Sequence, residues 1–368
     1  QLNMQDPAFN PNDPEDAENV RGSVGAQWRL FDLQRAAGQN MARLGTEAGA
    51  QAFAAARNQL VHDVTRGFYG VLQAQAFADV QAEAIRSIEE SLRIARERFA
   101  AGGAVKTDVL NLETQLAQAN EDLIRARNGA QLALAALNAA IGADLVAADT
   151  IAAPADAALA APPPKCTNPQ AYEDRPEFRA ARLMRQIKEQ DVRKAQGGYA
   201  PTVSAFGSYD LDSEDAGDFQ DSYVVGVMAE INVFDGARTR AAVRAARADL
   251  AAARADEEKA RLNLKLDLQQ AFLGAQEAWE RLEVVRKSLE TAREARRIVQ
   301  EQYQQGAVDV ALLLQTQVGA TATETRAAAA RYDYLTALSN LQRAKGELAD
   351  SRYSESRIQD SESHPQSF

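Results

Sequence analysis

Residues 98–102 read Arg-Phe-Ala-Ala-Gly and residues 302–306 read Gln-Tyr-Gln-Gln-Gly, so an aromatic residue stands three positions before a glycine in both places. Other pairs of segments match at nearly the same separation, 203 or 204 residues. They are Phe31-Asp32 with Phe234-Asp235, residues 68–70 with 272–274, and residues 137–142 with 341–346. A constant offset that persists over more than a hundred residues predicts two structurally equivalent repeats.

Each repeat begins with a stretch in which apolar and polar side chains alternate. Residues 223–234 place apolar side chains at the odd positions, and residues 22–31 place them at the even positions. A period of two predicts a β-strand with one apolar and one polar face. The predicted polar face carries Gln27, Arg29, Glu230 and Asn232.

A second extended stretch precedes each of these strands. It comprises residues 201–211 in the second repeat and only the stub 1–6 in the first. Polar, acidic loops at 7–19 and 212–221 separate the partners, which predicts two hairpins and four strands per chain.

Long helical windows follow the strands, at residues 33–101 and 236–305. A continuous helix of that length would extend about 105 Å. Glycines then interrupt each window, and we expect positive φ at Gly102, Gly103 and Gly306. A second helix follows each interruption, and the helix 175–196 leads back to the strand 201–211. We expect Gly70 and Gly274, deep in the long helices, to mark close packing or a bend.

These patterns divide the chain into four segments. Residues 1–142 form the first repeat, 143–174 a connector, 175–349 the second repeat and 350–368 a polar tail that we expect to be poorly ordered. The first repeat has no counterpart of the helix 175–196, so we expect the chain to lack its natural N-terminus and signal peptide.

The composition excludes several classes of function. A net charge of −11 argues against nucleic acid as a partner. One cysteine and two widely separated histidines predict no disulfide framework, no metal site and no cofactor. Because no nucleophile or acid–base constellation occurs either, we expect that the chain is not an enzyme.

The strands predict a membrane protein although no stretch of about 18 apolar residues is present. Strands of a membrane barrel need only about 10 residues of alternating character. Four strands cannot close a barrel, and an open sheet edge cannot face lipid. Three chains would supply about twelve strands, an even number that can close.

Several motifs, weak singly but ordered and duplicated, resemble the TolC-like outer-membrane efflux proteins over nearly the whole chain. They are Phe-Asp-Gly-Ala-Arg at 234–238, Arg-Pro-Glu-Phe-Arg-Ala-Ala at 175–181, Gly-Tyr-Ala-Pro-Thr-Val-Ser at 198–204, Thr-Asp-Val-Leu at 107–110 after Gly102, and Tyr-Leu-Thr-Ala-Leu-Ser-Asn-Leu at 334–341.

The resemblance implies a mainly α-helical homotrimer with a twelve-stranded outer-membrane β-barrel, four strands per chain, continuous with a coiled-coil periplasmic tunnel. It implies a passive exit duct for small molecules or proteins in a tripartite efflux pump or type I secretion system. The implied partners are outer-membrane lipid, a periplasmic adaptor and, through the adaptor, an inner-membrane transporter. The polar strand face would line the barrel lumen.

The resemblance also assigns roles to the glycine turns, which become the periplasmic tips. The implied adaptor-docking residues are Gly102, Gly103, Ala104, Val105, Gly306, Ala307 and Val308. The implied periplasmic aperture residues are Lys106, Asp108, Asn111 and Asp309.

The chain departs from the family pattern at a few positions. Arg29 and Asn232 stand where the family usually has proline, and Leu33 stands where the second repeat has Gly236. The family's aperture acid falls on Asp108 in the first repeat but on Leu312 in the second, where Asp309 is the nearest acid.

Two other functions remain open at this point. A periplasmic adaptor would carry one helical hairpin per chain between soluble β-domains. A soluble coiled-coil scaffold would not need the alternation at 223–233.

Overall fold

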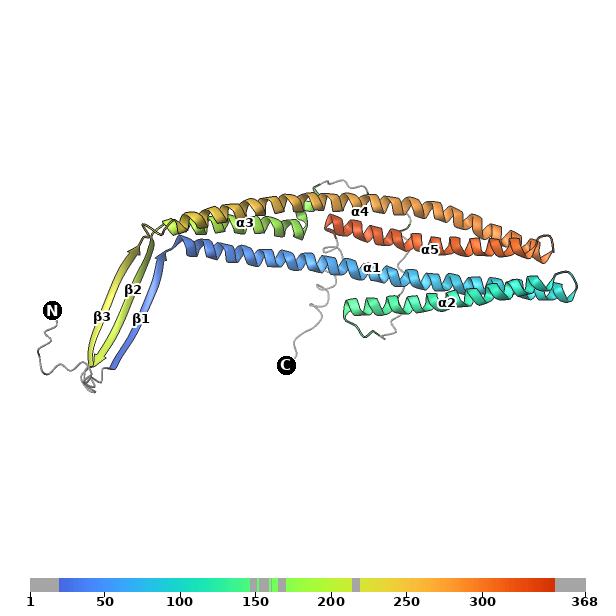
Figure 1. Cartoon of the computed structure of the whole chain (residues 1–368), viewed down its shortest axis with the longest axis horizontal. Coiled ribbons are helices and arrows are strands. Elements are labelled where there is room, and N and C mark those ends of the chain that lie inside the picture. Colours follow the sequence, from blue (N-terminus) through green and yellow to red (C-terminus); the bar gives the residue numbers. More distant parts are fainter. Residues whose placement is uncertain are drawn as a thin grey trace, which may run out of the picture. The chain divides into compact units, whose positions relative to one another are not determined.

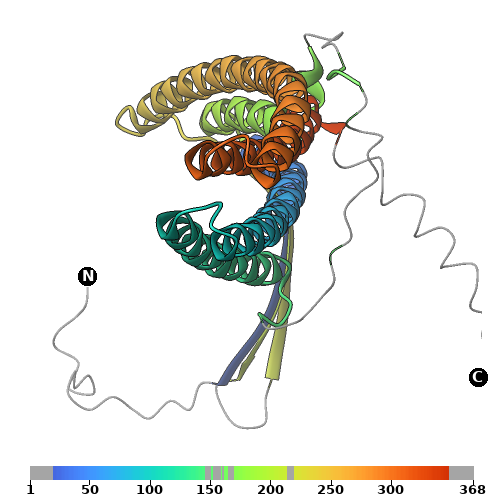
Figure 2. The ribbon, with the colours of Figure 1, turned by 90° about the vertical axis from the view of Figure 1, so that its right-hand side faces the viewer.

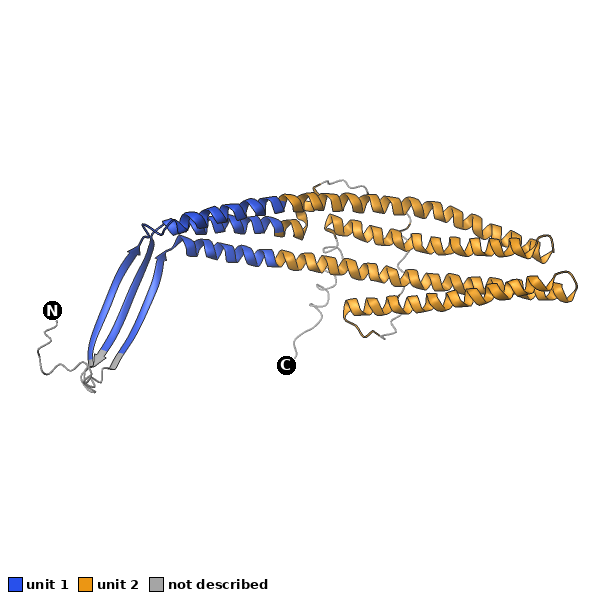
Figure 3. Cartoon of the chain, viewed as in Figure 1, with its two compact units in different colours: residues 1–49, 181–257 blue, residues 50–180, 258–368 orange. Residues whose placement is uncertain are grey.

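The computed structural model describes residues 20–145, 151, 159, 161–164, 170–213 and 219–347. The predicted stub 1–6, the loop 7–19, most of the connector and the tail 350–368 lie outside these residues. The chain forms two compact units (Figure 3). The first contains residues 1–49 and 181–257, and the second contains residues 50–180 and 258–368.

The described elements follow the predicted order (Figure 1). The first repeat contains strand β1 and helices α1 and α2, and the second contains α3, β2, β3, α4 and α5. Their bounds are β1 Val20–Phe31, α1 Leu33–Ala100, α2 Lys106–Ile141, α3 Pro176–Gln196, β2 Thr202–Ser213, β3 Phe219–Glu230, α4 Arg238–Gln304 and α5 Val310–Lys345, with the short 3-10 turns η2 (Ala171–Asp174) and η3 (Gly197–Tyr199) on either side of α3.

Two helix hairpins make up most of the second unit. Figure 1 and Figure 2 show α2 beside the second half of α1, and α5 beside the second half of α4. The buried residues at one end of this unit come from all four helices, including Ile88, Leu112, Tyr303 and Leu313. No described helix has an apolar run long enough to cross a membrane.

The sheet has the order β1-β2-β3, and both pairings are antiparallel. Residues opposite each other in the register share a face. Trp28 pairs with Ala205, which pairs with Val227, and this face is apolar. Gln27 pairs with Phe206 on the other face, which is largely polar. The predicted alternation is therefore present, and it extends across all three described strands.

The sheet corrects two details of the prediction. Strand β3 begins and ends four residues earlier than the predicted 223–234, so Asn232 lies beyond it. The ladder between β1 and β2 also shifts its register between Arg29 and Phe31. This irregularity puts Phe31, rather than Leu30, opposite Val203 on the apolar face. The alternation of apolar and polar residues in the sequence cannot reveal this bulge, because one extra residue at the end of a strand leaves the pattern of the other residues unchanged.

The repeated Phe-Asp motif places a helix cap at the start of each long helix. The carboxylate of Asp32 accepts the backbone N–H of Arg35 at 3.0 Å, and that of Asp235 accepts the N–H of Thr239 at 2.8 Å. Aspartate is a favoured residue at this position because its carboxylate accepts N–H groups that have no partner within the helix.

The second repeat has one additional residue at this cap. Gly236 and Ala237 both adopt a φ of 66° before α4 begins. Leu33 instead starts α1 directly after Asp32. This insertion explains why the offset between repeats grows from 203 to 204 residues, and why only the second repeat needs a glycine here.

The first of the two explanations for Gly70 and Gly274, close packing, is not met within the described part of the chain. A Cβ atom added to Gly70 or Gly274 would meet no atom within 4 Å. Close packing against another described part of the same chain is therefore not the reason for either glycine.

Replacing Asp235 with alanine should loosen the start of α4. The loss of an N-cap costs about 1 kcal/mol, or roughly fivefold in the local opening equilibrium. Hydrogen exchange of residues 238–245 measures this change. Asp256→Ala, at an exposed position well inside α4, is the matched control and should leave these amides unchanged. Equal exchange in both variants would contradict the capping role.

Candidate functional site

The two predicted tips have the same backbone geometry. Gly102 has a φ of 75° and Gly306 a φ of 76°. The N–H of Gly103 donates to the carbonyl of Arg98 at 2.7 Å, and the N–H of Ala307 donates to that of Gln302 at 2.8 Å. This Schellman arrangement ends a helix and reverses the chain. The expectation of positive φ is thus confirmed at Gly102 and Gly306 and wrong at Gly103.

The predicted docking residues lie at these turns and are largely accessible. Val105 is 60% exposed. Gly102, Gly103, Gly306 and Ala307 are exposed, while Ala104 and Val308 are half-buried. Each tip therefore presents a small, mostly apolar surface, with Lys106 exposed at the start of α2.

Arg98 links the two tips within the second unit. Its Nη1 donates to the carbonyl of Tyr303 at 2.8 Å, and its Nη2 donates to the carbonyl of Gly103 at 3.1 Å. The guanidinium carbon also lies 4.9 Å from the centre of the Tyr303 ring. One side chain of the first repeat thus binds both its own turn and the last turn of α4.

Tyr303 lies beneath this contact and is 1% exposed. Among the described residues, its hydroxyl has no hydrogen-bond partner. Burial raises the pKa of Tyr303, the Arg98 charge lowers it, and the Asp108 charge raises it further.

The four predicted aperture residues occupy two different structural positions. Lys106, Asp108 and Asn111 lie in the first turns of α2, and Asp108 is half-buried. The carboxylate of Asp309 instead accepts the backbone N–H of Leu312 at 2.9 Å and caps α5. Its equivalent in the first repeat is Val105, which provides no side-chain cap. The two acids are therefore not equivalent.

The predicted lumen residues gather around one cavity in the first unit. A cavity of about 350 Å³ is lined by Gln27, Arg29, Glu230 and Asn232, among others. The amide of Gln27 donates to the Ser204 hydroxyl at 3.2 Å. Asn232 reaches the cavity although it lies beyond β3. Arg29 pairs with Asp32 at 3.2 Å, so this arginine also stabilises the cap of α1.

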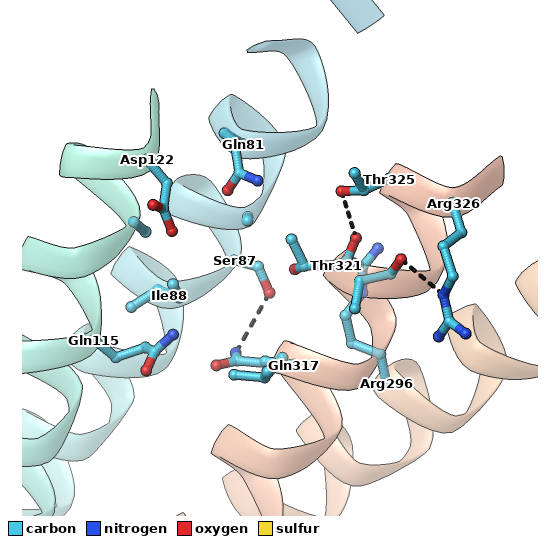
Figure 4. A pocket seen from close by; sticks show the side chains of 14 residues that line it. Gln81, Ser87, Ile88, Gln115, Asp122, Arg296, Gln317, Thr321, Thr325 and Arg326 are labelled. Carbon is cyan, nitrogen blue, oxygen red and sulfur yellow. Dashed lines mark hydrogen bonds between the residues drawn. The ribbon is translucent and has the colours of Figure 1, made fainter. Parts of the chain in front are cut away.

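The prediction missed a pocket between the two hairpins of the second unit. Figure 4 shows Ser87 of α1, Gln115 of α2 and Gln317 of α5 around it. Its volume is about 440 Å³. The buried Gln317 amide donates to the Ser91 hydroxyl at 2.8 Å. In the sequence, Ser91 and Gln317 are polar residues at positions where the helical period places buried side chains. The sequence does not show that α1 and α5 face each other there, so it could not predict this hydrogen bond.

A family model described as outer membrane efflux protein matches residues 2–143 and 168–347, which is most of the chain. No curated protein sequence matches the chain.

Solved structures of low sequence identity share the fold. A membrane protein from Pseudomonas aeruginosa is 20% identical, with a TM-score of 0.77 over 89% of this chain and 84% of that one. The Campylobacter jejuni CmeC outer membrane channel is 13% identical, with a TM-score of 0.76 over 90% and 78%. The open-state Neisseria gonorrhoeae MtrE outer membrane channel is 17% identical, with a TM-score of 0.76 over 90% and 80%.

The duplicated strand and helix-hairpin fold and the match of the family model lead to the same assignment. The chain belongs to the outer membrane efflux protein family, the TolC-like channels of the cell outer membrane, and it is a transport protein rather than an enzyme.

Proposed function

We propose that three copies of this chain form a passive exit duct through the outer membrane. The observation that carries this proposal is the described sheet. One face exposes Trp28, Tyr223 and Val225, which are 74%, 77% and 81% exposed. The opposite face carries polar side chains, including Gln27 and Arg29. A sheet with one lipid-like face and one polar face suits the wall of a water-filled barrel.

The sheet edges support the assembly of several copies. Among the described strands, β1 and β3 each pair only with β2. A strand edge that faces lipid leaves its backbone groups without hydrogen bonds, which costs several kcal/mol per group. Neighbouring copies would remove these edges. A twelve-stranded barrel requires a fourth strand from each copy, and the predicted stub 1–6 lies outside the described residues.

Exposed apolar side chains on the helices also favour a homotrimer. They recur along α2 and α4 and would be covered by the helices of a second copy, as in a coiled coil. They are Leu110, Ile124 and Leu132 on α2, and Leu262, Leu266, Leu273 and Val284 on α4.

We assign the helix tips to gating and to adaptor docking. In a trimer, Asp108 would recur three times around the axis and attract cations at the periplasmic aperture. Lys106 and Asn111 would flank that ring. Asp309 is the weaker candidate, because its carboxylate already caps α5. The small residues at Ala104, Val105, Ala307 and Val308 would accept a helical hairpin of a periplasmic adaptor, which connects the duct to an inner-membrane transporter.

The duct would export small molecules or proteins for a tripartite efflux pump or a type I secretion system. Opening requires the tips to move apart. Because Arg98 binds both turns, this contact would have to break when the adaptor docks.

The aperture assignment predicts the outcome of a single substitution. Asp108→Asn should weaken cation block of single channels in planar bilayers by about tenfold or more, since each channel loses three charges. Asp79→Asn removes an equal charge from an exposed position of α1 well before the tip, so it is the matched control. Unchanged block in Asp108→Asn would rule out a ring at this position.

The docking assignment predicts that charge at the tips prevents assembly. The double variant Val105→Asp and Val308→Asp should lose co-purification with the adaptor, because two desolvated carboxylates per chain would face an apolar partner. Ala117→Asp, on an exposed part of α2 away from the tip, should bind normally. Equal recovery of the adaptor with all variants would place docking elsewhere.

The contact of Arg98 predicts a more mobile aperture when it is removed. Arg98→Ala loses two charge-assisted hydrogen bonds, each of which contributes about 1.5–3 kcal/mol. Spin labels at residues 104 and 307 should then report a broader distance distribution and the channel a higher open probability. Arg96→Ala is the control, because Arg96 pairs with Glu113 inside one hairpin at 2.7 Å. Identical distributions in the two variants would contradict a tie between the tips.

A further inference from the structure

A second arginine-based contact lies far from the tips, where α3 begins and α5 ends. Asp267 of α4 binds two arginines at once. Its Oδ2 accepts Nη1 of Arg175 at 2.6 Å, and its Oδ1 accepts Nη2 of Arg343 at 2.8 Å. Arg175 immediately precedes α3, and Arg343 lies in the last turn of α5. One carboxylate therefore joins three helices, and we refer to Arg175, Asp267 and Arg343 as the clamp.

The clamp is partly buried, with the Arg343 and Asp267 side chains 16% and 31% exposed, so its groups depend on each other. The Arg175 side chain is 3% exposed and also bonds Glu177 at 3.0 and 3.3 Å. Burial raises the pKa of Asp267, but the hydrogen bonds from both arginines outweigh it and hold that pKa below the usual value. Removing one partner from such a network leaves an uncompensated buried charge.

His62 of α1 lies at the level of the clamp. The Gln73 amide of α1 donates to the Asp333 carboxylate of α5 at 3.4 Å, and about three helical turns away from this contact the two antiparallel helices bring His62 level with Arg343. The His62 side chain is half-buried, and its Nδ1 is buried without a hydrogen-bond partner among the described residues. The charged groups around it are Asp63 and Arg66 of α1, Asp267 of α4 and Arg343 of α5. Burial lowers the pKa of His62, and the Arg343 charge lowers it further. The charges of Asp63 and Asp267 act in the opposite direction, and the net effect favours the neutral imidazole.

We infer that His62 makes the clamp sensitive to pH. The neutral imidazole leaves Arg343 bound to Asp267. An imidazolium would repel the Arg343 guanidinium and compete with both arginines for the Asp267 carboxylate. The loss of these bonds would release the end of α5 and the start of α3 from α4. All of these contacts lie within one chain, so the clamp does not depend on the proposed duct.

The direction of the pH effect follows from the lowered pKa of His62. In the open state the histidine titrates near its ordinary value, about 6.5. The closed clamp binds the proton more weakly, so its stability is fully present above that value. Stability decreases as the pH falls below about 6.5 and becomes constant below the pKa of the closed state. At pH 5.5 the loss can reach about tenfold in the opening equilibrium.

Hydrogen exchange of the whole purified protein tests this inference. We expect amides at the end of α5 and the start of α3 to exchange up to about tenfold faster at pH 5.5 than at pH 7.5, after correction for intrinsic rates. His62→Gln should abolish the difference. The chain contains one other histidine, His364, and His364→Gln should retain it. Asp267→Asn should exchange rapidly at both pH values.

Two results would overturn the inference. One is wild-type exchange that does not change between these pH values, and the other is an unchanged pH effect in His62→Gln. If that variant does not fold, NMR titration of histidine-labelled wild-type protein decides the question, with His364→Gln used to assign the signals. A midpoint for His62 below 6.5 supports the inference, and a midpoint at or above 6.5 contradicts it.

Discussion

A helix of 68 residues cannot bury its own apolar side chains, so it must be covered along its length by other helices. In this chain the glycine turns meet that requirement. Each one reverses the backbone at the end of a long helix, so that α2 returns along α1 and α5 returns along α4. The packing of the second unit, the position of the tips and the exposure of the docking residues all depend on these two turns.

Two shorter helices cover α4: α3 packs along its first part and α5 along its second part. In the first unit, Arg185 and Lys188 of α3 pair with Glu257 and Asp249 of α4. In the second unit, α5 packs against α4 around the tilted pair Trp279 and Tyr334. The clamp at Asp267 lies where one covering helix ends and the other begins. A charged contact suits this place, because Arg343 in the last turn of α5 lies near the negative end of the helix dipole.

The buried polar groups of the second unit define how the helices align along their axes. Apolar ridges alone tolerate a shift by one helical turn, whereas a buried donor loses its acceptor after such a shift. Ser91 with Gln317, Arg98 with the Tyr303 carbonyl, and Arg175 with Asp267 each have one alignment in which the bonds form. Two of these contacts join different repeats, so they also fix the first hairpin against the second.

The sequence by itself determined the order of the described elements, the helix bounds to within a few residues and the turns at Gly102 and Gly306. These features follow from local backbone preferences and from periodicity, which neighbouring residues express directly. Only the tertiary structure decided the partners of Arg98 and Asp267 and the charges around His62, because these groups come from helices distant in the chain. It likewise decided that Asp309 is a helix cap, that β1 contains a bulge and that Asn232 lies beyond β3. Each depends on atomic contacts or on strand register, which side-chain type and spacing leave open.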